Sequence, residues 1–144
     1  MLSLEEIIHC GKKPEESDPN KLAQEKDLLT KINIIRAAYG KVTTPTSGVR
    51  TMADHLRIYA AKGITDRNKI PMKSKHLETI TDAAAVDIAD PDLALTKWLK
   101  NTPEGRAAAD KADLFFEDGN ANWLHAQNKP FGSYVKGGTR WFKP

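Results

Sequence analysis

The clearest pattern along the chain is a run of apolar positions at helical spacing between residues 21 and 39. Neighbouring members of the run lie three or four positions apart, which places them on one face of a helix. They are Leu28, Ile32, Ile35 and Tyr39. Asp18 and Pro19 are typical of a helix start, and Gly40 is typical of a helix end. The pattern therefore predicts a long helix that buries this apolar stripe.

Shorter patterns predict the other elements. Further helices are expected over residues 3–9, 51–61, 90–99 and 102–113, the second of them with Leu56, Tyr59 and Ala60 on one side. Strands are expected over residues 41–47, 83–88, 114–117, 123–127 and 139–142. Helices and strands mixed along one chain predict an α+β fold, in which helices flank a small, mostly antiparallel sheet.

The length of 144 residues is that of one domain, and no segment has the composition of an interdomain linker. We expect an N-terminal extension over residues 1–20 and a core over residues 21–144, in a protein that acts as a monomer. The single cysteine, Cys10, cannot form a disulfide within the chain. The longest apolar runs are far shorter than a membrane-spanning helix needs, so no membrane span is expected.

The charge and the N-terminus narrow the partners and the compartment. The net charge is only +3, and lysines are dispersed among acids, so nothing supports a nucleic-acid partner. The first ten residues carry two acids and lack the basic leader and apolar segment of a secretory signal. We therefore expect synthesis in the cytoplasm without a signal peptide.

Three residues could hold a metal ion. His76 falls in an expected loop, whereas Asp87 and His125 fall in expected strands. Two imidazoles and one carboxylate form the ligand set of an open zinc site, whose fourth position is left for water. Zinc lowers the pKa of a bound water to about 7 and so supplies hydroxide at neutral pH. Alternation along both strands keeps another interpretation open, in which Asp87 and His125 lie on a solvated face.

The residues around these positions resemble a known family. Ser74-Lys75-His76-Leu77, Ala85-Val86-Asp87-Ile88 and Trp123-Leu124-His125 resemble motifs of the zinc D-Ala-D-Ala metallopeptidases, which include VanY-like carboxypeptidases and phage endolysin peptidases. The resemblance covers roughly residues 22–144. It implies a Hedgehog/DD-peptidase-like fold, zinc bound by the two histidines and the aspartate, and hydrolysis of peptidoglycan stem peptides. It also implies a phage or prophage enzyme that acts at the cell wall or in a virion.

The same resemblance implies roles for further residues. Thr46-Ser47-Gly48-Val49-Arg50 resembles the family's Ser-Gly-Tyr-Arg segment, which implies that Ser47 and Arg50 bind the substrate. Many members place the general base three positions before the last histidine, where this chain has Asn122, and asparagine cannot accept a proton. The nearest acids are Glu117 and Asp118, so one of them is the expected catalytic base. For Asp118 a capping role at the turn before Gly119 is an alternative.

The spacing departs from the family at one place. The family's aspartate follows the first histidine by seven positions, whereas Asp87 follows His76 by eleven. Four extra residues within 78–82 account for the difference, and we prefer Asp87 to its rival Asp82 because Asp87 lies in an apolar strand. His55 is expected at a pocket edge or in the core. His9 and Cys10 are interpreted as structural residues.

The sequence therefore predicts a zinc-dependent peptidase whose cofactor is zinc and whose partners are peptidoglycan stem peptides. The longer loop and Asn122 favour an alternative, in which a degenerate, non-catalytic peptidase fold serves as a structural or binding component of a virion. A third hypothesis, a nucleic-acid or DNA-packaging factor, depends on the mild positive charge alone.

Overall fold

The computed structural model describes residues 1–7 and 18–143, which contain one five-stranded sheet. Its strands are β1 (Pro45–Ser47), β2 (Ala85–Ala89), β3 (Phe115–Glu117), β4 (Trp123–Gln127) and β5 (Trp141–Phe142). They lie in the order β1-β2-β4-β3-β5, and only β3 and β5 pair in parallel. The predicted α+β fold with a mostly antiparallel sheet is confirmed, although β1 is shorter than the strand predicted over 41–47.

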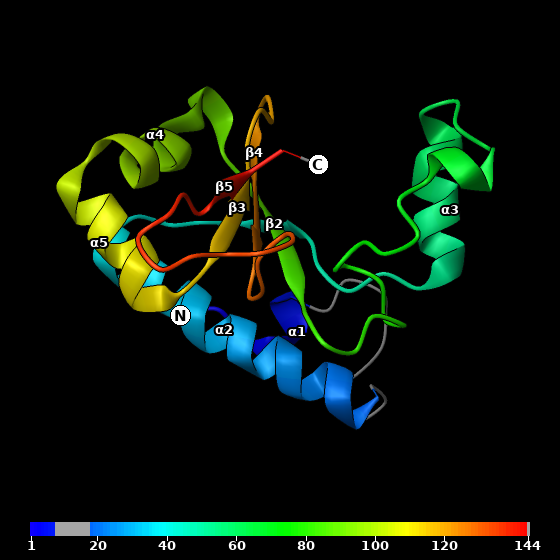
Figure 1. Cartoon of the computed structure of the whole chain (residues 1–144), viewed down its shortest axis with the longest axis horizontal. Helices are drawn as coiled ribbons and strands as arrows, with labels where there is room; N and C mark the ends of the chain where they lie inside the picture. Colours follow the sequence, from blue (N-terminus) through cyan, green and yellow to red (C-terminus); the bar gives the residue numbers. More distant parts are fainter. Residues whose placement is uncertain (8–17, 144) are drawn as a thin grey trace.

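The helices are distributed unequally between the two faces of the sheet. They are α1 (Leu4–Ile7), α2 (Pro19–Tyr39), α3 (Met52–Ala61), α4 (Ala94–Asn101) and α5 (Pro103–Ala112). Figure 1 shows α2, α4 and α5 gathered on one side of the sheet and α3 standing apart on the other. Among the described residues, no helix has both the length and the apolar character needed to cross a membrane.

The hydrophobic core lies between α2, α5 and one face of the sheet. The apolar stripe of α2 is confirmed there, since Leu28, Ile32 and Ile35 are buried and Tyr39 packs at the edge. The sheet contributes alternate residues of its central strands, which are Val86, Ile88, Leu124, Ala126 and Phe116. This alternation leaves the intervening residues of the same strands on the opposite face.

The ends of α2 lie where the sequence predicts them. The Asp18 side chain accepts hydrogen bonds from the backbone N–H groups of Asn20 at 2.8 Å and Lys21 at 3.3 Å. At the other end Gly40 takes the left-handed conformation, with φ of 70°, and its N–H donates to Arg36 O at 3.0 Å. These caps satisfy backbone groups that a helix end otherwise leaves without partners.

The buried face of α3 differs from the prediction. Leu56 and Tyr59 are half-buried and Ala60 is exposed, whereas the buried residue of this helix is His55. The reason is that α3 contacts its own following loop through this face, and His55 Nε2 donates to Pro71 O at 2.8 Å. A helix that does not cover the sheet has no need of the expected apolar stripe.

The helix predicted over 90–99 is divided in two. Pro91–Leu93 forms a 3-10 turn, in which Asp92 and Leu93 have positive φ angles of 62° and 55°. The Asp90 carboxylate then accepts from the N–H groups of Leu95 and Thr96, both at 2.9 Å, and so caps the start of α4. The restart of the helix therefore depends on a side chain that precedes the turn.

The first seven residues contribute to the core, although they belong to the predicted N-terminal extension. Leu2 and Ile7 are buried in the hydrophobic cluster, and the Asn33 side chain bonds to both backbone polar groups of Leu2. The helix predicted over 3–9 is present as α1, and Glu6 accepts from Ser3 N at 2.6 Å. The last two positions of the predicted helix, residues 8 and 9, lie outside the described residues, and so does Cys10.

Candidate metal centre

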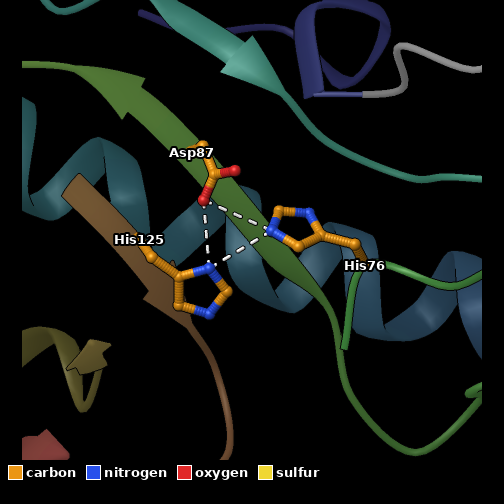
Figure 2. A group of neighbouring side chains, drawn as sticks. All are labelled: His76, Asp87 and His125. Atoms are coloured by element: carbon orange, nitrogen blue, oxygen red, sulfur yellow. Dashed lines mark hydrogen bonds and ion pairs between the residues drawn. The ribbon is translucent and has the colours of Figure 1, made fainter. Parts of the chain in front are cut away.

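Two strands and one loop bring the three predicted ligands together. Asp87 in β2 and His125 in β4 are directly opposite each other in the antiparallel register, so their side chains leave the sheet on the same face. His76 reaches the same point from the loop that precedes β2 (Figure 2). This face is the one turned away from α2. The three residues that the motif singles out therefore form one cluster in space.

The donor atoms of this cluster form a compact triangle. His76 Nε2 lies 3.2 Å from His125 Nδ1, and Asp87 Oδ1 lies 3.3 Å from the former and 3.0 Å from the latter. In a tetrahedral zinc site with bonds near 2.05 Å, neighbouring donors are about 3.3 Å apart. The triangle thus has the size of one face of such a tetrahedron, and a fourth ligand position lies outside it.

The outer nitrogens of both rings fix where the protons lie. His76 Nδ1 is 2.7 Å from Gly48 O, and a carbonyl only accepts, so Nδ1 carries the proton. His125 Nε2 is 2.9 Å from Gln127 Oε1, and this amide is oriented by its own N–H bond to Lys129 O at 2.7 Å. Each inner nitrogen therefore directs a lone pair at the Asp87 carboxylate. With both rings neutral, three lone pairs converge there, an arrangement that a metal ion between them, or a proton on one ring, relieves.

Burial and charge set the pKa values of the cluster. Burial disfavours the ionised form of Asp87, but both imidazoles outweigh it and hold the pKa of that carboxyl well below its usual range. Burial also lowers the pKa of His76, and Asp87 offsets only part of this effect. Burial also lowers the pKa of His125, but the hydrogen bond and charge of Asp87, together with the hydrogen bond to Gln127 and the charge of Glu117, outweigh burial and raise it. A proton on His125 therefore competes with a metal ion for the same position.

Arg50 and Ser47 border the cluster on the side of β1. Arg50 Nη2 lies 3.4 Å from Asp87 Oδ2, so Asp87 turns one oxygen to the histidines and the other to the guanidinium. Arg50 Nε donates to Ser47 Oγ at 3.2 Å, and Ser47 is opposite Asp87 in the sheet register. The backbone of Arg50 also donates to His76 O at 2.8 Å. Both predicted substrate-binding residues thus lie beside the proposed ligands.

The two candidate bases point to different sides of the sheet. Phe115 and Phe116 of β3 pair with Gln127 and Ala126, and the next step of this register places Glu117 opposite His125. Asp118 instead pairs with Lys100 of α4, with Nζ and Oδ1 2.5 Å apart, and this bond lowers the pKa of Asp118. Of the two acids, Glu117 is therefore the one on the face of the metal cluster.

Two residues that sequence reasoning did not assign to the site support its geometry. A side chain at Gly48 would place Cβ 1.6 Å from Ile7 O, so only glycine lets α1 approach the carbonyl that orients His76. Gln127 orients His125, and its position two residues further along the same strand was an available signal, because residues two apart share a face.

The remaining candidates lie elsewhere. Asp82, the rival of Asp87, is not part of the triangle, and its charge acts instead on Lys21 of α2. His55 is buried and hydrogen-bonded to Pro71 O, as the core interpretation predicts. Trp123, a residue of the third motif, is 37% exposed.

Comparison of the chain with protein-family models, with curated proteins and with solved structures finds no match. The geometry by itself supports a buried His76–Asp87–His125 group that could hold a metal ion. The family and the activity therefore enter only as proposals.

Proposed function

We propose that this protein is a zinc-dependent peptidase of the D-Ala-D-Ala metallopeptidase type, which hydrolyses an amide bond in peptidoglycan stem peptides. The observation that carries the proposal is the convergence of His76 Nε2, His125 Nδ1 and Asp87 Oδ1 in a triangle with edges of 3.0–3.3 Å. The substrate class comes from the motif resemblance, which also favours a phage or prophage enzyme that acts at the cell wall or in a virion.

The donor set favours zinc among the common metal ions. Imidazole suits zinc, copper, iron and nickel, whereas magnesium and calcium prefer oxygen ligands. Two histidines and one carboxylate at tetrahedral spacing correspond to the three-ligand zinc sites of hydrolases. A zinc ion held there would act as a Lewis acid on the scissile carbonyl and make water more acidic.

The chain's own residues divide the remaining work. Glu117 lies in the same row of the sheet as His125, and its carboxylate would take a proton from the attacking water and pass it to the leaving amine. Arg50 would orient a substrate carboxylate, since its bonds to Ser47 and Asp87 use Nε and Nη2 and do not need Nη1. Ser47 holds the guanidinium in place for this task.

The test measures zinc first and hydrolysis second. Elemental mass spectrometry of the purified protein should find about one zinc per chain, and His125→Ala should lose it because the site then lacks one of its three donors. Glu117→Gln should keep the zinc but release stem-peptide fragments from purified peptidoglycan at least about 100-fold more slowly, since it lacks the base.

Two outcomes would contradict the proposal. A wild-type protein that holds no zinc after reloading and removal of excess metal would rule out the zinc mechanism. A protein that holds zinc but cleaves no peptidoglycan would favour the non-catalytic alternative, a binding component built on the same fold.

A further inference from the structure

We propose that Lys21 of α2 is a positioning residue for the metal centre, because it fixes the loop that separates His76 from Asp87. The inference rests on the proposed zinc site. The Lys21 side chain is buried, with only 1% of the residue exposed. Its ammonium group donates to Lys75 O at 2.9 Å and to Ala83 O at 2.7 Å. One buried cation therefore holds both ends of the loop over residues 76–82.

The two acceptors lie where the loop most affects the ligands. Lys75 directly precedes His76, and Ala83 lies two positions before the first residue of β2. Because both carbonyls bond to a single nitrogen, they cannot separate without breaking a buried hydrogen bond. This clamp, the Lys21 ammonium group with its two carbonyl partners, thus removes freedom that the ten residues between the ligands would otherwise give to His76.

Lys21 is itself held firmly. Its backbone N–H donates to the Asp18 cap, and Glu25, which is fully buried, carries the opposite charge one helical turn further along. Desolvating an ammonium group is costly, so two well-placed acceptors and an acidic neighbour are needed to keep it inside the protein. The same α2 that covers the core therefore also fixes the loop of the metal site.

A second anchor limits the expected effect. His76 O accepts from Arg50 N at 2.8 Å, and Arg50 O accepts from Glu78 N at 2.8 Å, so the loop keeps one attachment without Lys21. Loss of the clamp should loosen His76 rather than remove it. Residues that support metal ligands from outside typically change metal affinity by about 10- to 100-fold.

The experiment compares Lys21→Met with Lys31→Met, a lysine on the same helix that pairs with Asp27 and Asp113 away from the site. Zinc affinity is measured by competition with a chromophoric chelator, and cobalt(II) absorption spectra report the coordination geometry. Lys21→Met should bind zinc about 10- to 100-fold more weakly with an altered cobalt spectrum, while Lys31→Met remains like wild type. Wild-type affinity and spectrum in Lys21→Met would overturn the proposal.

A rescue experiment decides the matter where Lys21→Met fails to fold. Lys21→Cys, made together with Cys10→Ser, is alkylated with bromoethylamine while unfolded, which rebuilds a lysine-like ammonium, and is then refolded. Recovery of wild-type zinc affinity supports the clamp. Recovery of the fold without that affinity overturns it.

Hydrogen exchange tests the role of Lys21 independently of whether the proposed zinc site exists. If the wild type takes up no zinc, the proposed function fails, but the clamp still predicts faster exchange of amides in residues 75–84 of Lys21→Met than of wild type. Unchanged exchange in that segment would overturn the clamp, whatever the metal result.

Discussion

The face of the sheet toward α2 and the face that carries the metal cluster are built from alternate residues of the same strands. The first is apolar and buried beneath helices, with Val86, Ile88, Leu124, Ala126 and Phe116. The second carries a row of polar side chains across neighbouring strands, which are Ser47, Asp87, His125 and Glu117. Only the first is covered by α2, α4 and α5 (Figure 1).

This difference shows how a small domain can stabilise its fold with one face of a sheet and build a metal site on the other. Because side chains alternate with a period of two, neighbours such as Asp87 and Ile88 serve different faces. Burial of the apolar face supplies the main driving force for folding. The other face can then hold converging lone pairs and a buried carboxylate, which are costly without a cation. Substitutions at adjacent positions should therefore have separate consequences.

The largest effect is expected from Asp87→Asn. The amide keeps the size of the side chain but removes the negative charge and replaces one carboxylate oxygen with an NH2 group, which cannot bind zinc. Zinc affinity should fall by more than about 100-fold, which is the largest loss typical for mutation of a residue that only supports a ligand. Chelator competition measures this, and circular dichroism should show that the fold remains. Near wild-type affinity in Asp87→Asn would contradict the assignment of Asp87 as a ligand.

The neighbouring substitution, Ile88→Ala, should do the reverse. Ile88 is 1% exposed, and the cavity left behind should lower the free energy of unfolding by about 2–5 kcal/mol, measured by urea denaturation. Under conditions where the variant is folded, its zinc affinity should stay close to that of wild type. A loss of zinc as large as in Asp87→Asn would show that the two faces are not independent.

A pH effect is expected from Lys21, a charge buried on the core side of the molecule. Burial lowers the pKa of Lys21 from 10.5 to about 8. Between these values the unfolded chain binds more protons than the folded one, so the free energy of unfolding should rise with pH, by roughly 3 kcal/mol at most. This gain is complete above pH 10.5 and is lost as the pH falls through about 8.

Urea denaturation of wild type and Lys21→Met across this pH range measures the effect. The difference between the two proteins isolates Lys21, because the other titrating groups are common to both. A difference that stays constant with pH would contradict the lowered pKa.

Much of the fold could be predicted from the sequence because its signals are local. The cap residues and apolar spacing of α2 give both of its ends, and alternation gives the bounds of β4. The buried face of α3 could not be predicted, because His55 packs against a loop that has no periodic pattern. Likewise, Asp90 caps α4 across a turn with positive φ angles, which spacing alone does not indicate.

The candidate site likewise contains residues that the sequence predicts and residues that it does not. The motif brings out His76, Asp87 and His125, because ligand residue types and their order are visible in the sequence. The roles of Gly48 and Lys21 depend on tertiary contacts instead: the first with Ile7, the second with Lys75 and Ala83. No local pattern encodes an approach between segments so far apart in the chain.

The smallest effect is expected from Asp118→Asn, which tests the comparison at its finest point. Asp118 and its partner Lys100 are each 32% exposed, and such ion pairs contribute about 0–1 kcal/mol, so stability should change little. Peptidoglycan hydrolysis should also stay at the wild-type rate, because the carboxylate lies on the side of α4. Glu117→Gln, one position away, is the matched control that should lose hydrolysis. If Asp118→Asn lost hydrolysis and Glu117→Gln kept it, the catalytic base would lie on the side of α4. The assignment of all catalytic residues to the other face of the sheet would then be wrong at β3.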